Sequence, residues 1–135
     1  MPLLVFEALT ADVQRAYEQD PSLIVWWGTE LECASALSRR ERHEERPAKA
    51  VTQAFQRLEA LKGSWHEIQP AEAVRRAARR LLRVHDLRTA DALQVAAAIV
   101  AAEGHPEMLE VVTLDERMGD ALLKEGFELA TLGLP

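Results

Sequence analysis

Cysteine, aromatic residues and long apolar runs are all scarce in this 135-residue sequence. The one cysteine, Cys33, excludes a disulfide framework within the chain and is typical of a protein from a reducing compartment. A membrane-spanning helix needs about 20 apolar residues, and the sequence contains no such run and no pattern of a signal peptide. We therefore expect a cytoplasmic protein that does not insert into a membrane.

Positive charge is also in deficit, because 22 acidic residues outnumber 16 basic ones and give a net charge of −6. A protein of this charge does not attract phosphate backbones as a whole, so a nucleic-acid site must be a local basic patch or act through a metal ion. One stripe of arginines, at positions 75, 76, 79, 80 and 83, lies opposite the apolar face of a predicted helix. Such a stripe is usually a solvated face, and contact with RNA or a partner is the alternative.

The periodicity of apolar residues predicts one α/β domain over residues 1–135. Strands are predicted at 23–27, 64–68, 109–114 and 127–132. Helices are predicted at 8–19, 30–42, 48–61, 71–85, within 85–102 and between 115 and 126. Because helices separate the strands, the connections are right-handed crossovers, and we expect a mainly parallel sheet covered by helices on both faces.

Acids that follow strands are the most informative residues, because ligands of such sheets gather at the carboxyl ends of the strands. Asp115 follows "VVTL" directly, Asp91 lies in the first turn of its helix, and Glu32 lies early in the helix after "LIVWW". The helix dipole alone stabilises an acid in a first turn by about 0.3–1 kcal/mol, so each has a simple structural explanation. Together, three acids at one sheet edge repel one another, and a divalent cation relieves that repulsion.

The stretches "ELECASALSRRER", "LRTADALQVAAAIV" and "VVTLDERMGDALLKEGFEL" resemble the second, third and fourth conserved blocks of PIN domains, specifically of VapC-type ribonuclease toxins. The resemblance covers residues 23 to 129 and implies a three-layer α/β/α fold. It implies that Glu32, Asp91 and Asp115 hold Mg²⁺ or Mn²⁺ for RNA hydrolysis, with Thr113 as an auxiliary hydroxyl. An RNA substrate, an antitoxin protein and a homodimer are the partners that it implies.

Two details of the resemblance concern neighbouring residues. Glu30 competes with Glu32 for the second acid, but Glu32 has the family's distance to "SAL" and "RRER". Gln94 stands where relatives often have histidine, a departure that need not affect metal binding.

The family's first acid has no counterpart in "MPLLVFEALTADVQ", because relatives open with an apolar strand that ends in an Asp–x–Ser-like turn. Either the motif precedes Met1, or "LLVF" is the first strand and Glu7 replaces the aspartate. We favour the first explanation, because the segment between Glu7 and Glu32 is short for the family's helices and strand. A first strand that is missing or altered would then leave a gap in the sheet, and three acids would bind a cation more weakly than four.

Three classes of function follow from these patterns. The first is a metal-dependent endoribonuclease, the toxin of a toxin–antitoxin pair. The second is a catalytically impaired PIN module that acts through dimerisation and antitoxin binding. The third is a receiver-like domain that accepts a phosphoryl group, which we rank last because the sequence lacks paired acids near its start and a lysine at a late strand end.

Overall fold

A five-stranded parallel sheet forms the centre of the molecule, with the strands in the order β3-β2-β1-β4-β5. The structure is a computed structural model that describes residues 3–5, 23–43, 47–113 and 115–130. The strands are β1 (Leu3–Val5), β2 (Leu23–Trp26), β3 (His66–Ile68), β4 (Glu110–Val112) and β5 (Glu128–Leu129). All four neighbouring pairs run parallel, which confirms the predicted sheet type.

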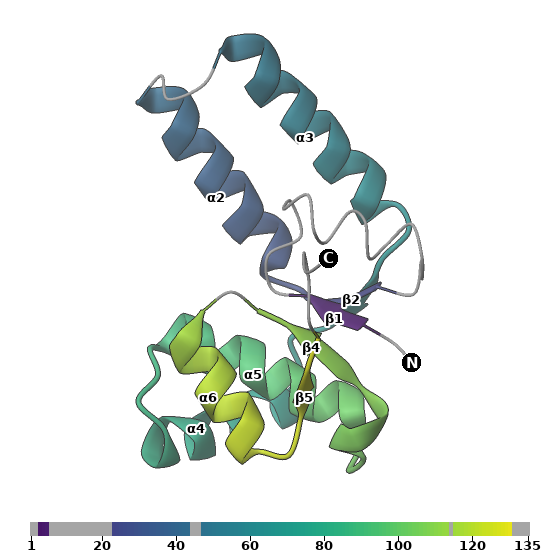
Figure 1. The fold of residues 1–135 in the computed structure, drawn as a ribbon, viewed down its shortest axis with the longest axis vertical. Helices are drawn as coiled ribbons and strands as arrows, with labels where there is room; N and C mark the ends of the chain where they lie inside the picture. Colours follow the sequence, from purple (N-terminus) through teal and green to yellow (C-terminus); the bar gives the residue numbers. More distant parts are fainter. Residues whose placement is uncertain (1–2, 6–22, 44–46, 114, 131–135) are drawn as a thin grey trace.

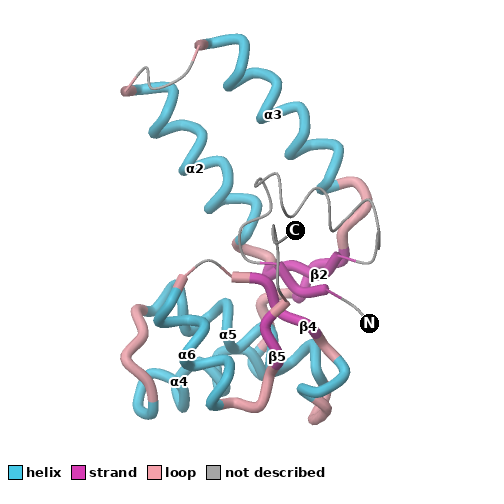
Figure 2. The backbone as a smooth tube through the Cα atoms, viewed as in Figure 1, coloured by secondary structure: helices cyan, strands magenta, loops and turns pink. Residues whose placement is uncertain are grey.

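Helices cover both faces of this sheet, so the expected three-layer α/β/α arrangement is confirmed (Figure 1). They are α2 (Thr29–Arg42), α3 (Ala48–Lys62), α4 (Glu72–Val84), α5 (Thr89–Ala102), the short η1 (Pro106–Met108) and α6 (Glu116–Lys124). On one side, α2 and α3 form a hairpin that extends away from the sheet, while α4, α5 and α6 pack together on the other (Figure 2). No helix within the described ranges is both long and apolar enough to cross a membrane.

The central position of the sheet belongs to β1, which pairs with β2 on one side and β4 on the other. Leu3 aligns with Leu23 of β2 and with Glu110 of β4. Leu3–Val5 therefore supply the central strand of the sheet, and the expectation of a missing strand and a gap at this position was wrong. Glu7 and the helix predicted at 8–19 lie outside the described residues.

The core consists of two apolar clusters, one on each side of the sheet. Along β2, Leu23 and Val25 join the cluster under α2 and α3, whereas Trp26 joins the cluster under α4, α5 and α6. This alternation follows from the two-residue repeat of a strand. In α5 the alanines 92, 96, 97 and 98 are fully buried, because this helix lies between the sheet and α4. Small side chains allow that close packing, which explains the alanine-rich sequence.

An ion-pair cluster joins the end of α4 to the end of α6. Arg80 donates hydrogen bonds from Nη1 and Nη2 to the Glu125 carboxylate at 3.2 and 2.5 Å. Nε2 of the nearly buried His85 lies 2.8 Å from the same carboxylate. The hydrogen bond from Arg80 is the main cause that lowers the pKa of Glu125; His85 adds to this effect, and burial opposes it.

We expect this cluster to make stability depend on pH in the acidic range. Because the folded pKa of Glu125 is lowered, its contribution is present above the ordinary pKa of 4.5 and is lost as pH falls through the folded value. Glu125→Gln should cost about 1–2 kcal/mol at pH 7 and should flatten this acid dependence. Chemical denaturation at neutral and acidic pH measures both effects, with Glu128→Gln at an exposed position as the control. An unchanged pH profile in Glu125→Gln would contradict the assignment.

Candidate active site

The first turns of α2 and α5 carry the two acids that the structure brings together, Glu32 and Asp91. α2 begins three residues after β2 ends, so its first turn lies at the carboxyl edge of the sheet. α5 packs against β2 and against α4. Its first turn places the Asp91 carboxylate near enough to Glu32 for the two negative charges to interact. The acid that interrupts the alanine-rich sequence of α5 therefore faces a second acid across the site.

Glu32 is half-buried, and burial is the larger of two causes that raise its pKa. The negative charge of Asp91 is the second cause. Burial of a carboxylate beside another carboxylate is unfavourable unless a cation or a set of hydrogen-bond donors compensates for it. The electrostatics of this pair are therefore those of a site that attracts a positive charge.

Glu30, the competitor for the role of second acid, has a different partner. Its carboxylate oxygen Oε1 forms an ion pair with Nζ of Lys62 on α3 at 3.0 Å, and this contact joins the start of α2 to the end of α3. Glu30 thus belongs to the packing of the helix hairpin, and Glu32 belongs to the acid pair.

Gln94 is a third polar residue of the site. It lies one turn after Asp91 on α5, is 4% exposed, and donates a hydrogen bond from Nε2 to Oε2 of Glu32. Its carbonyl oxygen, Oε1, is buried and has no hydrogen-bond partner within the part of the chain that the structure describes. A buried acceptor without a partner costs about 1–3 kcal/mol. Gln94 therefore holds the Glu32 carboxylate in place, while its own buried carbonyl oxygen has no partner among the described residues.

Thr29 is a second residue that the sequence analysis did not include in the site. It is the first residue of α2, is fully buried, and lies one helical turn before Glu32. Its Oγ1 also lacks a hydrogen-bond partner among the described residues. The signal that identifies both Thr29 and Gln94 in the sequence is their three-residue spacing from an acid of the pair.

Asp115 has a structural role at the start of α6. Its Oδ1 accepts a hydrogen bond from the backbone N–H of Met118 at 3.0 Å, so the side chain caps the helix. Oγ1 of Thr113 accepts a hydrogen bond from the Asp115 backbone N–H at 3.1 Å. Both residues line a shallow hollow of about 360 Å³ at the end of β4.

The expected convergence of three acids is not found in this structure. Over residues 3–5, 23–43, 47–113 and 115–130, no three His, Cys, Asp or Glu side chains lie close enough to hold one metal ion. Glu32 and Asp91 interact electrostatically, whereas Asp115 caps α6 and does not form a group of three acids with them. Glu7, the alternative first acid, falls outside the described residues.

The donor set around Glu32 suits a hard divalent cation. It comprises the carboxylates of Glu32 and Asp91, so every donor is an oxygen. Mg²⁺ characteristically binds through one or two carboxylates and keeps several of its waters. Two carboxylates of this kind are therefore chemically compatible with a hydrated Mg²⁺ or Mn²⁺.

The fold of this chain also occurs in solved structures, although no family model and no curated protein matches its sequence. PAE2754 from Pyrobaculum aerophilum superposes with a TM-score of 0.60 at 20% identity, over 90% of this chain and 79% of that chain. A toxin–antitoxin complex from Klebsiella pneumoniae gives a TM-score of 0.57 at 16% identity, over 85% of this chain and 87% of that chain. At these identities the likeness concerns the fold, which is one found in a toxin–antitoxin complex.

We expect Asp91→Asn to lower the pKa of Glu32. Removal of the neighbouring negative charge eliminates one cause of the raised pKa, while burial, the larger cause, keeps it above its ordinary value. NMR titration of carboxyl-labelled glutamate in the metal-free protein measures this shift. Asp86→Asn is the matched control, because the Asp86 side chain is 91% exposed in the loop between α4 and α5. An identical Glu32 titration in wild type and Asp91→Asn would show that the two carboxylates do not interact.

Proposed function

We propose that this chain is a metal-dependent endoribonuclease of the PIN/VapC toxin type, the toxin of a toxin–antitoxin pair. The observation that carries the proposal is the half-buried Glu32 carboxylate beside Asp91. The hydrogen bond from the buried Gln94, which holds the Glu32 carboxylate in place, supports it further. A fold shared with a toxin–antitoxin complex, and the three sequence blocks that resemble those of VapC toxins, agree with the same function.

Each residue of the site has a defined role in this proposal. Glu32 and Asp91 would bind Mg²⁺ or Mn²⁺, and Gln94 holds the Glu32 carboxylate in a fixed orientation. When bound, such a cation lowers the pKa of a coordinated water and neutralises charge that develops on the scissile phosphate. Hydrolysis of this kind requires no side-chain nucleophile, and the buried Cys33 lies in the core under α2 and α3.

A second candidate function is an impaired PIN module that acts through dimerisation and antitoxin binding. The observation that favours it is the position of Asp115, whose carboxylate caps α6 instead of joining the acid pair. Both candidates share the same protein partners: an antitoxin and a second copy of this chain. They differ in whether two acids suffice for RNA hydrolysis.

Cleavage of a mixed-sequence RNA in Mn²⁺ separates the two candidates. We expect wild type to cleave in Mn²⁺ and to lose activity in a chelator, because the acid pair supplies the charge that retains the cation. Asp91→Asn should reduce the rate by about 100-fold or more, since even outer partners of a metal site contribute about 10–100-fold. Asp86→Asn, with the same change of charge at an exposed loop position, should cleave like wild type.

Asp115→Asn adds a second comparison within the same assay. If Glu32 and Asp91 form the site alone, Asp115→Asn retains most of the activity, because an asparagine still caps α6. Cleavage that continues in a chelator and survives Asp91→Asn would refute the metal-dependent mechanism. Absence of cleavage by a folded wild-type protein that still binds a co-expressed antitoxin would favour the impaired module.

A further inference from the structure

The outer face of α4 concentrates positive charge in a chain whose net charge is −6. This 13-residue helix carries five exposed arginines, Arg75, Arg76, Arg79, Arg80 and Arg83. Its opposite face buries Val74, Ala78 and Leu81 in the core. The basic residues are therefore held on one side of a helix that is fixed to the rest of the domain.

Three of these arginines have no acidic partner within the described ranges. Arg75 pairs with Glu72 at 3.2 Å, and Arg80 pairs with Glu125. Arg76, Arg79 and Arg83 make no ion pair with any described residue. We call these three residues the free arginines.

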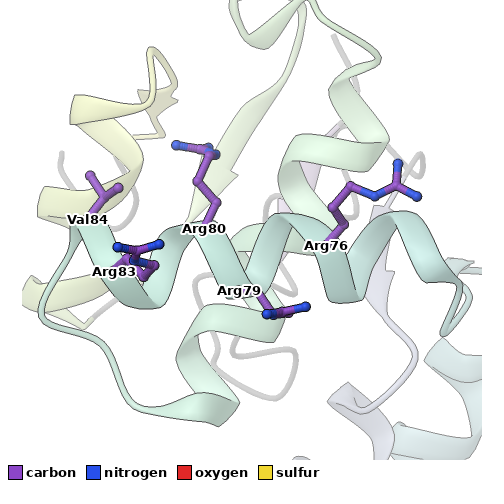
Figure 3. Close-up of a pocket in the computed structure, with 5 residues that line it drawn as sticks. All are labelled: Arg76, Arg79, Arg80, Arg83 and Val84. Atoms are coloured by element: carbon purple, nitrogen blue, oxygen red, sulfur yellow. The ribbon is translucent and has the colours of Figure 1, made fainter.

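The free arginines surround a shallow surface hollow. With Arg80 and Val84 they line a space of about 580 Å³ along α4 (Figure 3). The figure shows the four guanidinium groups spreading outward from successive turns of the helix. Val84, which is 60% exposed, adds an apolar surface at one end.

The stability of α4 does not explain this arrangement. Arginine in the last turn favours a helix through its dipole, which accounts for Arg83 but not for Arg76 near the start. Like charges three or four residues apart repel each other, as in the pairs Arg76–Arg79 and Arg79–Arg83. The face therefore retains a repulsion that an anionic ligand would relieve.

We propose that the free arginines bind the phosphate backbone of single-stranded RNA. This inference rests on the proposed function, because it assigns a docking surface to the RNA substrate. Arg76, Arg79 and Arg83 follow one another along the helix at intervals of three and four residues, close to one turn of about 5.4 Å, and each guanidinium group can bind a phosphate through two parallel hydrogen bonds. RNA matches such a row better than an acidic peptide does, because every unit of RNA carries a fixed negative charge.

RNA binding at this face of α4 should depend neither on the RNA sequence nor on a bound metal ion. Contacts to phosphates carry no direct sequence information, and the hollow is lined by four arginines and a valine, with no aromatic side chain to stack on a base. The acids Glu32 and Asp91 lie on α2 and α5, whereas the free arginines belong to α4. RNA should therefore bind to α4 in a chelator, when no cation is available to the acid pair.

Fluorescence anisotropy of a labelled single-stranded RNA, titrated with the full chain in a chelator at several salt concentrations, tests the inference. In the triple variant Arg76→Gln, Arg79→Gln, Arg83→Gln, affinity at low salt should fall at least tenfold. The slope of log K against log salt should decrease by about 2, because each lost phosphate contact removes about 0.7. The matched control is the triple variant Arg39→Gln, Arg40→Gln, Arg42→Gln, which changes the net charge equally at exposed positions on α2. Circular dichroism establishes that both variants are folded.

Each outcome decides the inference separately from the proposed function. Retained affinity and slope in the α4 variant, or equal losses in the α2 control, would overturn it. Polyglutamate that competes as strongly as unlabelled RNA would overturn it in favour of an acidic protein partner. Arginine-dependent binding without any cleavage in Mn²⁺ would support this docking surface while the proposed ribonuclease fails. Cleavage by wild type, with RNA affinity unchanged in the α4 variant, would support the ribonuclease function and refute the docking surface on α4.

Discussion

The parallel pairing of the short strand β1 with both β2 and β4 is the constraint on which the rest of the structure depends. Without this strand, the facing edges of β2 and β4 would expose unpaired backbone groups within the domain. Its backbone hydrogen bonds join the half of the sheet that leads into α2 to the half that leads into α6. The positions of Glu32 and Asp115 at the carboxyl edge follow from this order of strands.

At the carboxyl edge of the sheet, acids that occupy similar positions at helix starts have different environments. Glu32, Asp91 and Asp115 all lie at helix starts, where free N–H groups favour negative charge. The Asp115 carboxylate accepts a hydrogen bond from the backbone N–H of Met118, one of these free groups, and so caps the helix. Glu32 instead lies half-buried beside Asp91, and the result is a raised pKa. Proximity of a second acid, more than position on a helix, therefore distinguishes a candidate site from a structural acid.

Much of the fold can be predicted from the sequence, because the apolar periodicity alternates clearly between strand and helix. The first strand was harder to predict, since the three residues Leu3–Val5 are too few for a periodic signal and depend on pairing with distant segments. The sequence resemblance named Glu32, Asp91 and Asp115 together, and it could not reveal that the Asp115 carboxylate caps α6. The sequence does not predict a contact for Gln94, and only the structure shows its hydrogen bond to Glu32.

The account depends most directly on whether Glu32 and Asp91 hold a divalent cation. Titration of Mn²⁺ into the metal-free protein, with free Mn²⁺ followed by electron paramagnetic resonance, measures this without any assay of activity. The account predicts saturable binding of one Mn²⁺ per chain, weakened at least tenfold by Glu32→Gln and by Asp91→Asn. Binding should be unchanged in Asp86→Asn, whose carboxylate is exposed in the loop before α5. Mn²⁺ affinity that is equal in wild type, Glu32→Gln and Asp91→Asn would contradict the account.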